Sequence, residues 1–304
     1  MPIANAHDCV SQAPSAAGLP LRRDLLVGCG EWGLRNLPMD DHFRIAQRFG
    51  FEYLEFGIGG GQAGRLPESP SAQDVLAFRA LGQRYKIQTP FCCIENDFTL
   101  SDPQAHERML GKVLSQIESA ADCGATHVRL FAGFTPVGRM TEPQWLRMIE
   151  AFERCDELCQ RLAMVIAIET HGAIVANSDG SLTHQPTVTT DGQGLRRLLA
   201  ELPGRIGINY DPGNLKAAGA DGDLHLGLLN GQINYCHMKD WRRVGQGLAA
   251  CAIGDDDLDY VPLLGRLAFN GVYVIEYEPL EDTEHGIGRS LDYLKRIVPS
   301  IRFR

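Results

Sequence analysis

Short apolar runs alternate with longer amphipathic stretches along most of the chain, which is the pattern of parallel strands joined by helices. Each apolar run has the length and composition of a buried strand. The predicted strands are residues 25–29, 51–56, 87–92, 126–131, 164–170, 205–211, 233–237 and 272–277. The predicted helices are residues 41–49, 71–85, 103–123, 142–162, 190–202, 222–230, 259–269 and 284–298.

The stretch 103–123 carries helix signals at both ends. Asp102 precedes Pro103 at the first helical position, and Gly124 follows the last. Apolar side chains recur three and four positions apart at Leu110, Val113, Leu114, Ile117 and Ala121. One face of this helix is therefore expected to pack on a core. Thr141 and Gln144 have the spacing of a capping box before the next helix.

The number of strand–helix units selects the fold class. Eight such units in a chain of 304 residues predict a single-domain (β/α)8 TIM barrel over residues 24–304. A doubly wound sheet is the alternative, but it usually carries a nucleotide-binding fingerprint after its first strand. Gly59, Gly61 and Gly64 have the fingerprint spacing after the second strand, yet Pro67 follows where a helix should begin. We interpret this segment as a loop over the barrel mouth.

Two further segments are predicted to lack regular structure. Residues 1–23, rich in Ala, Ser and Pro, are expected to form a flexible N-terminal tail. Residues 172–190 are polar and show no apolar periodicity. We expect a loop there, either one that closes over a substrate or an ordinary surface loop.

Composition and charge narrow the class of function. The chain has 29 Lys and Arg against 38 Asp and Glu, for a net charge of -9, which argues against nucleic-acid binding. No apolar run approaches the roughly 18 residues of a membrane span, and the N-terminus lacks a secretion-signal pattern. The 9 cysteines include no C-x-x-C pair and are expected to be mostly reduced core thiols. These features predict a cytoplasmic protein that binds neither membrane nor nucleic acid.

Four polar residues end predicted strands: Glu169, Asp211, His237 and Glu276. The C-terminal strand ends of a barrel form one mouth, which is where barrel active sites lie. Three carboxylates there would raise one another's pKa unless a cation neutralised them. The set predicts one divalent metal ion, and its oxygen and imidazole donors suit Mn²⁺ first, with Mg²⁺ or Co²⁺ as alternatives.

The strand period adds candidate substrate contacts. Residues two apart on a strand share a face, so His171 accompanies Glu169 and Lys239 accompanies His237. Each polar residue alone has a structural explanation, such as a carboxylate that caps a neighbouring helix. Lys239 is the one cation that the pattern places inside the mouth, which favours an unphosphorylated sugar or keto-sugar.

The positions of the two glutamates suggest a reaction. Glu169 and Glu276 come from strands three steps apart around an eight-stranded ring, so they should flank the metal. One glutamate would remove a proton from the carbon beside the carbonyl of a ketose, and the metal would hold the enediolate. The other glutamate would return the proton, giving an epimer or an aldose–ketose isomer. Loss of a β-leaving group would instead make a lyase or dehydratase, and the residues leave these outcomes open.

Four motifs together resemble the xylose isomerase-like TIM-barrel superfamily, also called the sugar phosphate isomerase/epimerase family. They are Ile168–Gly172, Asn209–Asn214, His237–Asp240 and Ile275–Glu278, and the segment Gly254–Tyr260 is also similar. The resemblance covers about residues 24–298 and implies a (β/α)8 barrel with sugar or polyol substrates. It implies one divalent metal on Glu169, Asp211, His237 and Glu276. It also implies acid/base roles for Glu169 and Glu276, as in the ketose 3-epimerases.

The chain departs from parts of that family. Asn214 stands where the ketose 3-epimerases and endonuclease IV enzymes carry a His, and we expect it to contact substrate. No Asp-x-His follows His237, so a DNA-repair nuclease with a zinc cluster is not expected. Arg242 and Arg243 lie off the position of the epimerase arginine.

The resulting hypothesis is a metal-dependent sugar isomerase or epimerase with a small-molecule sugar as its partner. The alternative is a lyase or dehydratase that uses the same enolate, for example to cleave 3-keto-glycosides. A non-catalytic sugar-binding barrel has no need for two carboxylates across a metal. Barrels of this family often pair, so a homo-oligomer stays open.

Overall fold

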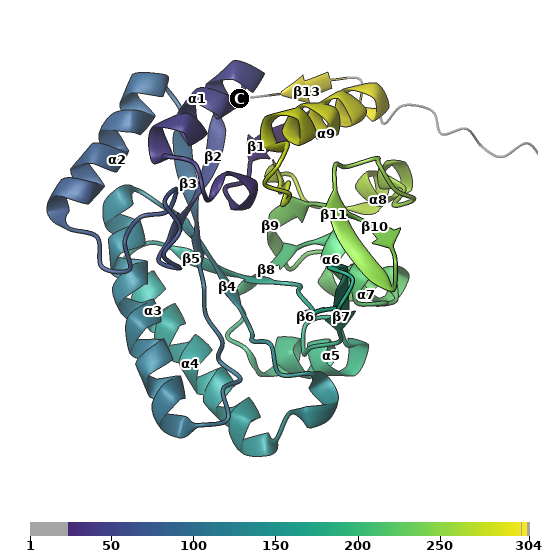
Figure 1. The fold of residues 1–304 in the computed structure, drawn as a ribbon. Coiled ribbons are helices and arrows are strands. Elements are labelled where there is room, and N and C mark those ends of the chain that lie inside the picture. The colour runs from purple at the N-terminus through teal and green to yellow at the C-terminus, as the bar shows by residue number, and fades with distance from the viewer. Residues whose placement is uncertain (1–23, 299, 303–304) are drawn as a thin grey trace, which may run out of the picture.

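The computed structural model describes residues 24–298 and 300–302 (Figure 1). The predicted N-terminal tail, residues 1–23, lies outside the described residues.

Eight parallel strands close into a ring. In order around it they are β1 (Asp24–Cys29), β2 (Tyr53–Ile58), β3 (Gln88–Ile94), β4 (His127–Phe131), β5 (Val165–Glu169), β8 (Gly207–Tyr210), β9 (Ile233–Met238) and β12 (Val272–Ile275). Pairing of β1 with β12, where Leu26 lies opposite Val272, closes the barrel. This closure confirms the predicted (β/α)8 TIM barrel and excludes the doubly wound sheet. A further strand, β13 (Ser300–Arg302), also pairs with β1.

Helices surround the strands (Figure 1). They are α1 (Met39–Phe49), α2 (Ala72–Tyr85), α3 (Pro103–Cys123), α4 (Glu142–Arg161), α5 (Gly192–Glu201), α6 (Pro212–Ala217), α7 (Gly222–Leu229), α8 (Tyr260–Arg266) and α9 (Thr283–Ile297), with short 3-10 helices η1 (Trp32–Leu34) and η2 (Val137–Arg139). Helix α3 has the predicted bounds, because the Asp102 carboxylate accepts two N–H groups at its start and Gly124 ends it with a φ of 94°. The predicted capping box of Thr141 and Gln144 is present. Helix α6, which directly follows Asp211, was not among the predicted helices.

Two hairpins form a second, antiparallel sheet. Its strands are β6 (Ala173–Ala176), β7 (Leu182–Gln185), β10 (Asp240–Val244) and β11 (Gly247–Cys251), in the order β10-β11-β7-β6. The prediction of a loop over residues 172–190 is therefore wrong, and the β10–β11 hairpin was not predicted. Three of the four residues of β6 are exposed, so no alternating apolar pattern marks it in the sequence. Both hairpins extend from C-terminal ends of barrel strands, β5 and β9, and so lie at the mouth.

Other expectations concern the glycine-rich segment, the cysteines and membrane spans. Gly59 and Gly61 have φ values of 78° and 76°, and the segment that follows β2 forms turns rather than a helix, as expected for a loop. All 8 cysteines in the described ranges are buried and none of them forms a disulfide, as predicted for core thiols. None of the helices within residues 24–298 is both long and apolar enough to span a bilayer.

Candidate metal centre and active site

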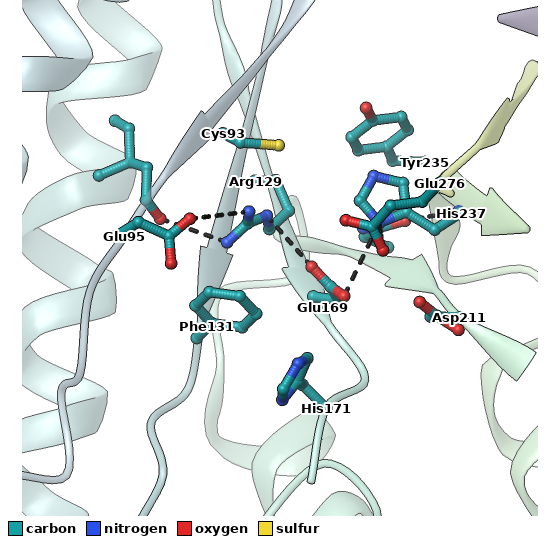
Figure 2. Close-up of polar contacts among 12 residues, drawn as sticks. Cys93, Glu95, Arg129, Phe131, Glu169, His171, Asp211, Tyr235, His237 and Glu276 are labelled. Carbon is teal, nitrogen blue, oxygen red and sulfur yellow. Dashed lines mark hydrogen bonds and ion pairs between the residues drawn. The ribbon is translucent and has the colours of Figure 1, made fainter. Parts of the chain in front are cut away.

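The four strand-end residues come together at the mouth of the barrel (Figure 2). Glu169 ends β5, Asp211 is the N-cap of α6, His237 lies in β9, and Glu276 follows β12. One donor atom from each lies within 4.8 Å of the others, and the residues are 0–5 % exposed. The structure thus brings together all four residues that the sequence proposed as metal ligands.

The orientation of His237 is set by a glutamate that the sequence did not suggest. His237 Nε2 lies 2.7 Å from Glu55 Oε1, which also accepts the Tyr235 hydroxyl. Because an ionised carboxylate can only accept, His237 donates from Nε2. Its Nδ1 faces the other carboxylates, 3.4 Å from Glu276 Oε2 and 3.7 Å from Glu169 Oε1, and has no hydrogen-bond partner among the described residues. A histidine held by a carboxylate with its second nitrogen free is the usual arrangement of a metal ligand.

The electrostatics of the centre fit a cation. Burial would lower the pKa of His237, but Glu276, Glu55 and Glu169 outweigh it and raise that pKa well above its usual value. Burial raises the pKa of Asp211 to about 7, against the opposing charge of Lys239, and the nearby carboxylates add to the rise. Three buried carboxylates and one free imidazole nitrogen form a donor set that suits a hard or borderline divalent ion.

Asn214 holds two of the candidate ligands. Its side-chain amide donates to Glu169 Oε1 at 3.0 Å and to Asp211 Oδ2 at 2.9 Å, and its backbone N–H donates to Asp211 Oδ1 at 2.9 Å. Its Oδ1 accepts the indole N–H of Trp241 at 3.3 Å. The residue is fully buried, and the structure places it behind the carboxylates rather than on the wall of the cavity beside them.

A cavity of about 620 Å³ opens beside the centre, and four of the predicted site residues line it: Glu169, His171, Lys239 and Glu276. Lys239 Nζ lies 2.5 Å from Glu276 Oε2 and 2.6 Å from Glu278 Oε1. Nδ1 of His171 lies 2.6 Å from the Gly172 carbonyl oxygen, and burial lowers the pKa of this histidine. His171 therefore presents a neutral ring to the cavity at neutral pH.

Arg129 is a second cation at the mouth, which corrects the expectation that Lys239 stands there alone. Figure 2 shows Arg129 between Glu95 and Glu169, with Nη2 3.1 Å from Glu95 Oε1 and Nε 3.1 Å from Glu169 Oε2. Its guanidinium packs over the Phe131 ring, 4.1 Å from the centroid. The signal in the sequence was an arginine between the apolar residues Val128 and Leu130 of a strand, in phase with Phe131 two residues on.

Known proteins share this architecture. The family model described as xylose isomerase-like TIM barrel matches residues 43–297. The chain belongs to this family. Among its relatives, an inosose dehydratase from Geobacillus kaustophilus is 23 % identical over 280 residues, which are 81 % of this chain and 84 % of that protein.

Two solved structures share the fold. The IolI protein with a bound zinc atom has a TM-score of 0.71 and 15 % identity, with 90 % of this chain and 98 % of that chain covered. The 3-keto-D-glucoside 4-epimerase from E. coli has a TM-score of 0.67 and 15 % identity, with 90 % and 100 % covered. The match of the family model confirms the predicted family resemblance, and the two structures confirm the fold.

Proposed function

We propose that the protein is a divalent-metal-dependent isomerase or epimerase of a ketose or keto-sugar. The observation that supports this most directly is the pair of buried carboxylates, Glu169 and Glu276. They come from strands three steps apart around the ring, lie 3.7 Å and 3.4 Å from the free Nδ1 of His237, and line the same cavity. Two carboxylates that face one small volume can serve as base and acid in turn.

The metal would be held by Glu169, Asp211, His237 and Glu276. Their three carboxylates and one imidazole favour Mn²⁺, with Mg²⁺ or Co²⁺ as alternatives, and the zinc atom in the IolI structure is consistent with a divalent ion in such barrels. When bound, the ion would polarise the substrate carbonyl and stabilise negative charge on its oxygen.

The glutamates would move the proton. One carboxylate takes the proton from the carbon beside the carbonyl, and the C–H electron pair moves to the carbonyl, giving an enediolate. The second glutamate, protonated when the substrate binds, gives its proton to the other face of the same carbon or to the neighbouring carbon. The first glutamate then releases the proton that it removed, and the second takes one up before the next turnover. Arg129 on Oε2 and Asn214 on Oε1 fix both oxygens of Glu169, and Lys239 fixes Glu276, so neither carboxylate has to reorient.

The charges of the cavity favour a neutral polyhydroxylated substrate. The two buried cations, Arg129 and Lys239, are already paired with carboxylates, so neither is available as a phosphate site, and the third lining cation, Arg139, is an exposed side chain. The carboxylates that line the cavity are hydrogen-bond acceptors, which suit sugar hydroxyl groups. We propose His171 and Lys239 as contacts to those hydroxyls.

A lyase or dehydratase is the second candidate, favoured by the match to inosose dehydratase over 81 % of the chain. The first proton transfer would be the same, and the enediolate would then expel a β-leaving group. Lys239 lies in the cavity beside Glu276 and could donate a proton to the leaving oxygen. Cleavage of 3-keto-glycosides is one reaction of this type.

Buried cysteines without disulfides suit a reducing compartment, and we propose the cytoplasm for this protein.

Deuterium uptake from D2O tests the proposal. Manganese-loaded and chelator-treated protein would be incubated with a panel of ketoses and 3-keto-glycosides, and the products followed by NMR. Metal-dependent exchange at a carbon beside the carbonyl, with deuterium kept in an isomeric product, is expected for the isomerase or epimerase. An unsaturated product or a released alcohol would instead assign the lyase. Absence of exchange from every compound, with metal shown to be bound, would contradict both.

A further inference from the structure

The cavity has two chemically different halves. The inner half holds Glu169, Glu276 and Lys239, whose exposure is 1–5 %. The outer half is lined mainly by the apolar side chains of Phe131, Phe134, Pro136, Ile174 and Val175, and the cavity lining also includes the polar residues Arg139 and Gln185. Exposure rises to 41 % at Ile174 and 44 % at Val175, which places these two at the rim. A substrate that reaches the carboxylates therefore passes an apolar wall.

The aromatic side chains of this apolar wall pack against one another, and a hydrogen bond connects two of the segments that carry the wall. The Phe131 and Phe134 rings lie 4.9 Å apart, and both meet the His171 ring edge-on at 5.0 Å and 5.6 Å. The segment after β4 is tied to the hairpin after β5 by a hydrogen bond from the Val137 N–H to the Pro186 carbonyl, 2.9 Å long. The rings of Phe131, Phe134 and His171 thus form one packed cluster on the cavity wall.

Ile174 and Val175 are two neighbouring aliphatic residues that are exposed at the rim of the cavity. Isolated exposed hydrophobic side chains are ordinary on protein surfaces, whereas a contiguous apolar patch that edges a cavity commonly marks a binding site. Ile174 and Val175 are adjacent on β6 and both line the cavity. The other large exposed hydrophobics of the described residues are Leu76, Leu146, Val244 and Leu280, none of which lines this cavity.

The volume of the cavity also favours a ligand larger than a free monosaccharide. A six-carbon sugar has about twelve non-hydrogen atoms, and at roughly 30 Å³ each, the share of a water molecule in the liquid, it would fill at most about 360 Å³. The cavity measures about 620 Å³. A free monosaccharide bound at the carboxylates would leave the apolar half to water.

We infer that the outer half of the cavity is a subsite for an apolar, aromatic substituent carried by the sugar ring. The substrate class is then a keto-glycoside or similar ring with an apolar group, and not a free monosaccharide. The placement of the sugar ring at the carboxylates rests on the proposed function, whereas the subsite is inferred from the apolar side chains of the outer half alone.

Binding of two unreactive probes tests the subsite without any turnover. Phenyl β-D-glucopyranoside and methyl β-D-glucopyranoside share the ring and differ in the substituent, so their affinities for the metal-loaded full chain can be compared by calorimetry or saturation-transfer NMR. The subsite predicts that the phenyl compound binds at least about tenfold more tightly. Equal affinities, or no measurable binding of the phenyl compound at millimolar concentration, would overturn it.

Substitutions in the apolar wall test whether the preference for the phenyl compound arises there. Val175→Ser and Phe134→Ala are each expected to reduce the phenyl-over-methyl ratio to about threefold or less. Val175 is exposed at the rim, so its replacement should leave folding intact even if Phe134→Ala does not. Val244→Ser is the matched control, because Val244 is 41 % exposed on another strand of the same small sheet and lies off the cavity. A ratio unchanged in Val175→Ser, or equally reduced in Val244→Ser, would contradict the inference.

The 3-keto forms of the same two glucosides separate this inference from the proposed function. If metal-dependent deuterium exchange occurs and kcat/KM favours the phenyl compound, the result supports both the proposed function and the subsite. If neither compound exchanges while the phenyl preference in binding persists, the proposed proton transfer fails on these ketones and the subsite remains. Exchange at equal kcat/KM for both compounds would overturn the subsite alone.

Discussion

Glu55 and His237 make a buried contact across the barrel that sets the direction of the imidazole. Oε1 of Glu55 on β2 lies 2.7 Å from Nε2 of His237 on β9, and the two residues are 182 positions apart in the chain. Glu55 Oε2 in turn accepts the N–H of Glu31 at 3.1 Å. The carboxylate is thereby fixed, and His237 Nδ1 is left facing Glu169 and Glu276.

Replacing Glu55 with Gln should weaken metal binding while the fold persists. The carboxylate makes His237 a stronger ligand and holds its tautomer, and loss of such a partner typically lowers metal affinity about 10- to 100-fold. Competition with a metal-sensitive dye measures the change. Glu52→Gln, on a half-buried residue of the same region, is the control and should bind metal normally. Unchanged affinity in Glu55→Gln would show that the contact does not tune the histidine.

Asn214→Ala distinguishes a positioning residue from a substrate contact. Because the amide bridges Glu169 and Asp211, its loss should reduce metal affinity and kcat about tenfold or more, with little change in KM. Steady-state kinetics at saturating metal make the measurement. The opposite pattern, a raised KM with kcat preserved, would assign Asn214 to the substrate. Asn230→Ala removes an amide that bonds only backbone groups on the outer surface and should leave both constants unchanged.

Arg129→Met should destabilise the protein far more than loss of a surface ion pair. The substitution removes the guanidinium from Glu169, which keeps its hydrogen bond from Asn214, and from Glu95, which keeps Arg65. Loss of one partner of a buried ion pair typically costs about 3–5 kcal/mol, whereas exposed pairs contribute about 0–1 kcal/mol. Arg154→Met, which breaks the exposed pair with Glu107, is the comparison. Denaturant unfolding of both variants gives the two free energies. Equal losses would mean that water screens the Arg129 network.

Glu31 should make the stability of the protein depend on pH. Its side chain is fully buried, neither carboxylate oxygen has a hydrogen bond among the described residues, and burial raises its pKa from 4.5 to about 7. Below pH 4.5 the group is protonated in both the folded and unfolded states. As pH rises toward 7 the unfolded chain loses this proton first, so the free energy of unfolding falls and then levels off above the folded pKa.

Glu31→Gln removes that ionisation. Its free energy of unfolding relative to the natural protein should therefore rise between pH 5 and pH 8, by up to roughly 3 kcal/mol. Denaturant unfolding of both proteins with chelator present measures the difference. Parallel pH profiles would show that Glu31 is not protonated in the folded state near pH 6.

The sequence predicted the site residues that lie at strand ends, because the end of a barrel strand has a known place at the mouth. Glu169, Asp211, His237 and Glu276 each close an apolar run, and the parallel strand ends of a barrel must meet at one mouth. Glu55 and Arg129 lie inside strands, where one polar residue in an apolar run has no defined partner until the ring closes. Their contacts depend on strands far apart in the chain, so no local pattern could identify them.

The hairpins at the mouth were missed for a different physical reason. Strand β6 is held by backbone pairing and by turn hydrogen bonds such as those from Ser181 to Asp179, not by a buried apolar face, and the last three of the five residues of β10 are exposed. Periodicity detects burial, and these strands have little of it. The outer wall of the cavity, which includes Ile174 and Val175, therefore became visible only in the structure.

Proton transfer by Glu276 with metal still in place tests the central claim most directly. The rate of exchange from D2O into the substrate would be measured for the natural protein, Glu276→Gln and the exposed control Glu281→Gln, with metal content determined for each. The account predicts that Glu276→Gln loses exchange by about 100-fold or more at saturating metal, whereas Glu281→Gln exchanges normally. Normal exchange in metal-loaded Glu276→Gln would contradict it.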